Sequence, residues 1–145
     1  MKTLIVYGST YGFTKDCVQK LSQQLKGEVT AVNAADGAVP SIDEFDNVIV
    51  GGSIYMGQIQ KEVKEFCASH TEELCGKRLG LFLCCGLPEN LEQEIKSSFP
   101  EKLLKKAMAI ENFGGELRTG KMKFIHRIIT KMMLKAAEKE GKEPP

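Results

Sequence analysis

The chain has 145 residues, a formal net charge of +1, an apolar share of 42% and a charged share of 27%, values typical of one soluble globular domain. They exclude disordered and fibrous proteins, and no apolar run approaches the length of a membrane-spanning helix. We therefore predict a single cytoplasmic domain over residues 1–145, and whether the native chain continues past Pro145 stays open.

The first half of the chain alternates short apolar runs with amphipathic segments. Residues 2–7 predict a buried strand, and apolar positions at helical spacing predict a helix from Thr14 to Gly27. Strands are then predicted over residues 28–33 and 47–51. One long helix follows, with an apolar face made by Ile59, Val63, Phe66 and Cys67 and an end at Gly76.

The same alternation continues in the second half. A fourth strand is predicted over residues 79–85, and a helix over residues 89–98 that Leu103 and Leu104 extend beyond Pro100. Residues 107–113 predict a fifth strand. Strands and helices alternating at this spacing imply right-handed crossovers, and so a parallel sheet with helices on both faces.

Ligands of such sheets bind beyond the carboxyl ends of the strands, where the strand order reverses. Three loops follow strands there, over residues 8–14, 51–58 and 86–90. The first has Ser9, Thr10 and Thr14 among glycines, so hydroxyl groups and backbone amides at a helix N-terminus can hold a phosphate. Neither a dinucleotide nor a nucleoside triphosphate motif is present, which leaves a monophosphate. The alternative is that these residues only cap the helix.

The stretch IVYGSTYGFT, residues 5–14, resembles the signature of the flavodoxin family, whose loop is usually Ser/Thr-x-Thr-Gly-x-Thr. Ser9, Gly12 and Thr14 match it, whereas Tyr11 replaces a threonine and Phe13 replaces the common asparagine. The resemblance implies a flavodoxin-like α/β fold: a doubly wound five-stranded parallel sheet in the order 2-1-3-4-5. It also implies an FMN cofactor and a role in electron transfer.

The resemblance further implies that the second and third loops hold the flavin ring. Tyr55 is expected to stack on the isoalloxazine, the alternative being an ordinary loop tyrosine. The third loop is expected to close the other side of the ring, although Pro88 as the first residue of a helix explains it almost as well. The predicted cofactor-binding residues are Ser9, Thr10, Tyr11, Gly12, Phe13, Thr14, Ser53, Ile54, Tyr55, Met56, Gly57, Gly86 and Leu87.

A narrower similarity concerns VIVGGSIYMG, residues 48–57, and Gly114–Arg118 followed by a basic segment. Both are similar to the flavodoxin-domain family of menaquinone-dependent protoporphyrinogen dehydrogenases. Three functions therefore stay open: an electron carrier, a flavoenzyme that passes electrons to a quinone, and a flavin-free binding module. No catalytic residue is predicted, because the flavin itself can supply the chemistry.

The basic segment predicts an amphipathic helix over residues 121–139, with Lys123, Arg127, Lys131, Lys135 and Lys139 in one row. It could pack on the sheet, contact a membrane surface peripherally, or dock a redox partner protein. No nucleic-acid partner is predicted. The five cysteines are interpreted as reduced core thiols, and neither they nor the two histidines predict a metal site.

Overall fold

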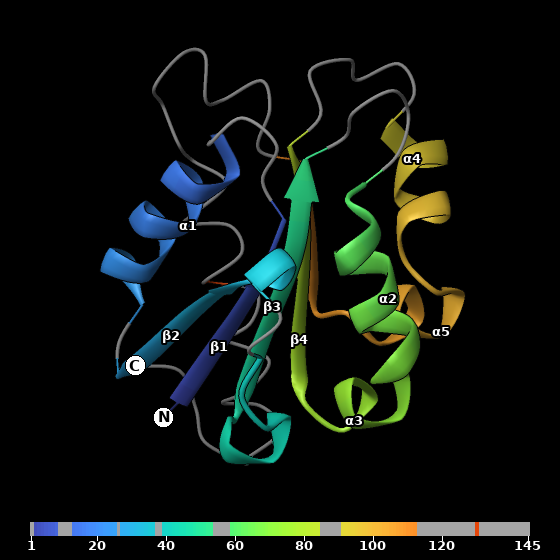
Figure 1. Cartoon of the computed structure of the whole chain (residues 1–145). Helices are drawn as coiled ribbons and strands as arrows, with labels where there is room; N and C mark the ends of the chain where they lie inside the picture. The colour runs from blue at the N-terminus through green and yellow to red at the C-terminus, as the bar shows by residue number, and fades with distance from the viewer. Residues whose placement is uncertain are drawn as a thin grey trace.

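The computed structural model describes residues 2–8, 13–25, 27–36, 39–53, 59–84, 91–112 and 130. In chain order the elements are β1 (Lys2–Tyr7), α1 (Phe13–Gln24), β2 (Glu28–Asn33), the 3-10 turns η1 (Ala34–Asp36) and η2 (Ile42–Glu44), β3 (Asn47–Ser53), α2 (Lys61–Ser69), α3 (Thr71–Cys75), β4 (Arg78–Cys84), α4 (Leu91–Ser98), α5 (Glu101–Lys106) and β5 (Ala109–Asn112). Figure 1 shows α1 on one side of the sheet and α2 on the other.

The sheet is five-stranded, with the order β2-β1-β3-β4-β5, and every neighbouring pair is parallel. The chain moves outward from β1 to β2, then returns to the other side of β1 to form β3. The strand order therefore reverses between β1 and β3, and the predicted fold class is confirmed.

The larger part of the core lies between the sheet and the helices from α2 onward. Alternate residues of the three central strands contribute Leu4, Val6, Val48, Val50, Leu79, Leu81 and Leu83, which pack with Val63, Phe66, Cys67, Leu74 and Leu103 from the helices. On the opposite face, α1 buries Val18 and Leu21. Each fully buried aliphatic side chain contributes roughly 1.5–3 kcal/mol, so this packing fixes the central strands firmly.

Two predicted helices are interrupted in the structure. The helix expected from Ile59 to Gly76 is divided into α2 and α3 at His70, whose φ of −121° and ψ of 21° are not helical. The helix expected to continue past Pro100 ends at Ser98, and α5 begins after Pro100. Proline has no N–H to donate and disfavours helical backbone in the residue before it, so the prediction of a continuous helix was wrong.

Within the part of the chain that the structure describes, no helix is both long enough and apolar enough to cross a bilayer. Of the predicted basic helix over 121–139, Thr130 alone is among the described residues. The amphipathic character of that segment therefore stays a prediction from the sequence.

Candidate functional site

The carboxyl ends of β1, β3 and β4 lie side by side at one edge of the sheet (Figure 1). Tyr7 at the end of β1 pairs with Gly51, and Ser53 at the end of β3 pairs with Cys84 at the end of β4. The three loops predicted to bind a ligand follow these strands directly, so the structure brings their starting points together. This edge, at the reversal between β1 and β3, is the candidate site.

Most predicted site residues lie outside the described part of the chain, namely Ser9, Thr10, Tyr11, Gly12, Ile54, Tyr55, Met56, Gly57, Gly86 and Leu87. The structure describes Ser53 and the backbone of Phe13 and Thr14, which begin α1. The first backbone N–H groups of a helix have no partner within it and attract anions. With a length of 12 residues, α1 supplies such an end immediately after the first loop.

The side chain of Gln60 makes two hydrogen bonds to Ser53, across the segment 54–58. The backbone N–H of Ser53 donates to Gln60 Oε1 at 3.2 Å, and Gln60 Nε2 donates to Ser53 Oγ at 2.7 Å. Because a backbone N–H can only donate, the first bond fixes which end of the carboxamide is oxygen. The Ser53 hydroxyl, as an acceptor here, still has its own proton to donate.

Glycines at this edge allow close approach of side chains to the strand ends. A Cβ on Gly52 would lie 2.4 Å from Gln60 Oε1, and a Cβ on Gly8 would lie 2.7 Å from the same atom. On Gly51 it would lie 2.4 Å from ring atoms of Phe82. A side chain at any of these three positions would overlap its neighbours, so glycine is needed there. Glycine also lets a ligand approach the backbone closely.

Tyr7 is the last residue of β1 and is 8% exposed. Burial raises the pKa of its phenol, and the nearby negative charge of Asp36 raises it further. The phenol is therefore neutral at physiological pH and keeps its proton as a hydrogen-bond donor.

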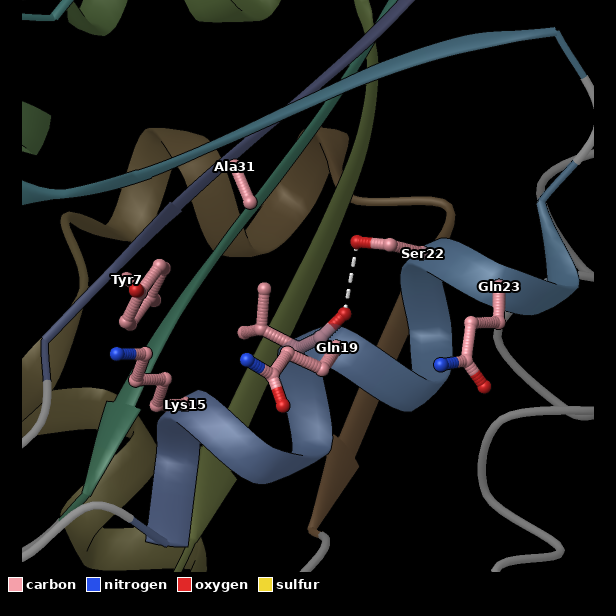
Figure 2. Close-up of a pocket in the computed structure, with 7 residues that line it drawn as sticks. Tyr7, Lys15, Gln19, Ser22, Gln23 and Ala31 are labelled. Carbon is pink, nitrogen blue, oxygen red and sulfur yellow. Dashed lines mark hydrogen bonds between the residues drawn. The ribbon is translucent and has the colours of Figure 1, made fainter.

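A pocket of about 590 Å³ lies beside Tyr7, between α1 and the strands. Figure 2 shows its lining residues, which are Tyr7 and Ala31 from β1 and β2 and Lys15, Val18, Gln19, Ser22 and Gln23 from α1. In the wall formed by α1, Ser22 Oγ donates to the Val18 carbonyl at 2.8 Å, so this hydroxyl bonds its own helix. The pocket lies along α1 rather than beyond the strand ends, and sequence reasoning did not predict it.

The structure describes the surroundings of two cysteines and one histidine, residue types often used in catalysis. Cys67 is buried, which raises the pKa of its thiol to about 12, and Cys75 is half-buried and free. The His70 ring stacks on Phe66 with centroids 4.7 Å apart. Among the described residues no group of three or more His, Cys, Asp or Glu side chains could hold a metal ion.

The sequence did not reveal Gln60, although its side chain lies between the ends of β1 and β3 at the candidate site. The only signal was its position immediately before Lys61, the first residue of α2, where Ser, Thr, Asp or Asn is preferred as the cap. Its side chain makes no cap hydrogen bond to its own helix. The side chain bonds Ser53 instead, seven residues earlier in the chain.

Comparison with known proteins agrees with this geometry. Residues 4–143 match a family described as a flavodoxin domain. An archaeal flavodoxin structure is similar over 92% of this chain and 99% of its own, with a TM-score of 0.57 and 18% identity. Oxidised flavodoxin 1 from Bacillus cereus is similar over 89% and 97%, with a TM-score of 0.60 and 15% identity.

A flavodoxin from Fusobacterium nucleatum, in a structure bound to flavin mononucleotide, is also similar. The likeness covers 76% of this chain and 69% of that one, with a TM-score of 0.55 and 20% identity. At these identities the three structures establish the fold that the sheet order had already indicated.

Proposed function

This chain belongs to the flavodoxin family, and from that membership we propose that it binds one FMN at the carboxyl edge of its sheet and transfers electrons. The observation that carries the proposal is the meeting of three features at the reversal between β1 and β3. These are the glycines at the ends of β1 and β3, namely Gly8, Gly51 and Gly52, together with the N-terminal end of α1 and the start of the loop after β3. The FMN-bound F. nucleatum flavodoxin, which has the same fold, supports the choice of cofactor.

The phosphate of FMN is assigned to residues 9–14, with hydroxyl hydrogen bonds from Ser9, Thr10 and Thr14. The backbone amides of Tyr11, Gly12 and Phe13 complete the cradle. A phosphate fits here because the first turn of α1 starts at Phe13 and offers N–H groups that have no partner within the helix, together with the positive end of the helix dipole. The loop needs no lysine for this purpose, since neutral donors suffice.

The isoalloxazine ring is assigned to the second and third loops. Ser53, Ile54, Tyr55, Met56 and Gly57 would contact one side of it, with Tyr55 stacking on the ring. Gly86 and Leu87 follow the adjacent strand β4 and would close the other side. The bound flavin supplies the redox chemistry, while these residues orient the ring and keep water from it.

FMN binding is tested by titration of the purified protein, followed by the visible spectrum and by flavin fluorescence. We expect one FMN per chain and weaker binding of riboflavin, which lacks the phosphate. Equal affinities would place the phosphate away from residues 9–14. A protein that leaves FMN fluorescence unchanged would instead be a flavin-free binding module of the same fold.

An electron carrier exchanges electrons with a redox partner, and the basic row of residues 121–139 is the proposed contact. Lys123, Arg127 and Lys131 would attract either an acidic protein or anionic lipid. Cosedimentation with anionic vesicles at low and high salt separates the two. Salt-sensitive binding that is lost when these residues are replaced by Glu would favour the quinone-linked reaction of the protoporphyrinogen dehydrogenase type. Absence from the vesicle pellet at every salt concentration would favour a protein partner.

A further inference from the structure

Gln60 lies between two loops that the proposed function gives to different parts of the cofactor. The phosphate loop begins at Gly8, and the ring loop begins at Ser53 and ends just before Ile59. Its carboxamide bonds Ser53 at 3.2 Å and 2.7 Å, which joins the two ends of the ring loop. The residues it joins are seven apart, so the contact depends on the fold and not on local helix geometry.

The same carboxamide packs on the start of the phosphate loop. Gln60 Oε1 occupies the space that a Cβ would need at both Gly8 and Gly52. The two glycines are neighbours across the sheet, because the Gly8 N–H donates to the Gly51 carbonyl at 3.0 Å and so continues the pairing of β1 with β3. One side chain thus contacts the backbone from which both loops start.

We propose that Gln60 is a positioning residue that couples the end of β1, where the phosphate loop starts, to the end of β3, where the ring loop starts, an inference that rests on the proposed binding of FMN. Its two hydrogen bonds fix the ends of the ring loop, and its contact with Gly8 transmits any displacement of those ends to the phosphate loop. The positions of the two strand ends are then linked, so the phosphate contributes its full affinity only when the end of β3 is held.

The first test uses the protein without flavin and measures amide hydrogen exchange by NMR. Gln60→Met keeps the length of the side chain but removes both hydrogen bonds. Faster exchange at Ser53 follows directly, since its N–H loses its acceptor. The proposal further expects exchange at Gly8 to rise about tenfold, although the acceptor of Gly8 is Gly51 and not Gln60.

Two controls limit the interpretation of this measurement. The amide of Asp46, which donates to the Lys2 carbonyl at 2.9 Å at the opposite edge of the sheet, should exchange at the wild-type rate. The exposed Gln24 at the end of α1 provides a matched variant, Gln24→Met, that should alter neither Ser53 nor Gly8. An unchanged rate at Gly8 in Gln60→Met would overturn the coupling whatever the flavin does.

The second test compares FMN with riboflavin. If Gln60 couples the loops, Gln60→Met weakens FMN more than riboflavin, and the ratio of the two affinities falls about tenfold. If both ligands weaken equally, Gln60 supports the ring loop alone and the coupling is wrong. If the wild-type protein binds neither ligand, the proposed function has failed, whereas a wild-type protein that binds FMN with an unchanged ratio in the variant rejects the coupling only.

Discussion

The two edges of the sheet are built from the same strands but with opposite chemistry. The carboxyl edge has Gly8 directly after β1 and Gly51 and Gly52 in the last residues of β3, with the side chains of other elements lying directly on their backbone. At the amino edge, the same two strands begin with buried polar side chains that bond each other. Asn47 Nδ2 donates to Thr3 Oγ1 at 3.1 Å, and the pair is almost fully buried.

Asp46 and Lys2 also bond each other at the amino edge. Asp46 N–H donates to the Lys2 carbonyl at 2.9 Å, and Lys2 N–H donates to Asp46 Oδ2 at the same distance. Most of these polar groups at the amino edge bond within the protein, although the buried Asn47 Oδ1 has no partner among the described residues. At the carboxyl edge lie the first N–H groups of α1, which have no partner within the helix. The difference teaches that the amino edge contributes to stability alone, whereas the carboxyl edge combines tight packing on its glycines with binding. Substitutions at the amino edge should consequently change stability without changing binding.

The largest expected effect is a loss of stability in Gly51→Ala. The new methyl group would lie 2.4 Å from the ring of Phe82, which is fully buried and has no room to move away. We expect the free energy of unfolding, measured by urea denaturation, to fall by about 3 kcal/mol. Gly76→Ala is the matched control, because its nearest contact would be at an ordinary 3.5 Å, and it should be close to neutral.

A smaller ring at position 82 should relieve that clash. The double variant Gly51→Ala, Phe82→Leu is expected to be more stable than the sum of the two single effects predicts, which a double-mutant cycle would show. Strictly additive losses would mean that the Phe82 ring does not set the size limit at Gly51.

The next largest effect concerns binding and leaves stability unchanged. Tyr55→Ala should weaken FMN by about 1–3 kcal/mol, the contribution expected of a large stacked ring. Urea denaturation of the flavin-free protein should give the wild-type midpoint. An unchanged FMN dissociation constant, measured by fluorescence titration, would show that another residue stacks on the flavin.

The sequence alone predicts the strands of this molecule better than the continuity of its helices. The strands could be predicted because apolar runs such as residues 2–7 and 47–51 are buried on both faces and end at glycines. The interruption at Pro100 was missed because Leu103 and Leu104 keep the apolar spacing of a helix, although proline prevents continuity of the backbone. Apolar periodicity shows which residues face the core but not whether the helix is unbroken.

The candidate site was predictable to a different extent. Its place beyond the carboxyl ends of the strands follows from the alternation of elements, and the structure confirms the sheet order that the flavodoxin resemblance implied. Gln60 could not be found from sequence, since its contact with Gly8 exists only after β1 and β3 pair. Long-range contacts of this kind depend on register, which no local pattern encodes.

At the amino edge, Thr3→Val should reduce stability without changing FMN affinity. The substitution keeps the shape but removes the acceptor of Asn47 Nδ2, leaving a buried donor unpaired at a cost of about 1–2 kcal/mol. Thr3→Ser keeps the hydroxyl and serves as the control. A change in the FMN dissociation constant of the valine variant would contradict the separation of the two edges.

The smallest expected effect is a pH-dependent one at Asp46. The hydrogen bond from the Lys2 N–H lowers the pKa of this carboxyl below its ordinary value of 3.8, and the charges of Arg78 and Lys77 lower it further. A carboxyl with a lowered pKa in the folded state stabilises the protein above the pKa of the unfolded chain. That contribution is lost as the pH falls through the folded value.

Asp46→Asn should therefore be less stable than the wild type at pH 7, by less than about 1 kcal/mol because the group is exposed. The difference should shrink below about pH 4 and vanish once the wild-type carboxyl is protonated, as urea denaturation between pH 2 and pH 7 would show. Asp43→Asn removes a charge from the exposed turn η2 and controls for net charge. If the two variants lose the same stability at pH 7 with the same pH dependence, the Asp46 carboxylate contributes nothing beyond its charge. The backbone bond from the Asp46 N–H to the Lys2 carbonyl would then be the one that stabilises this contact.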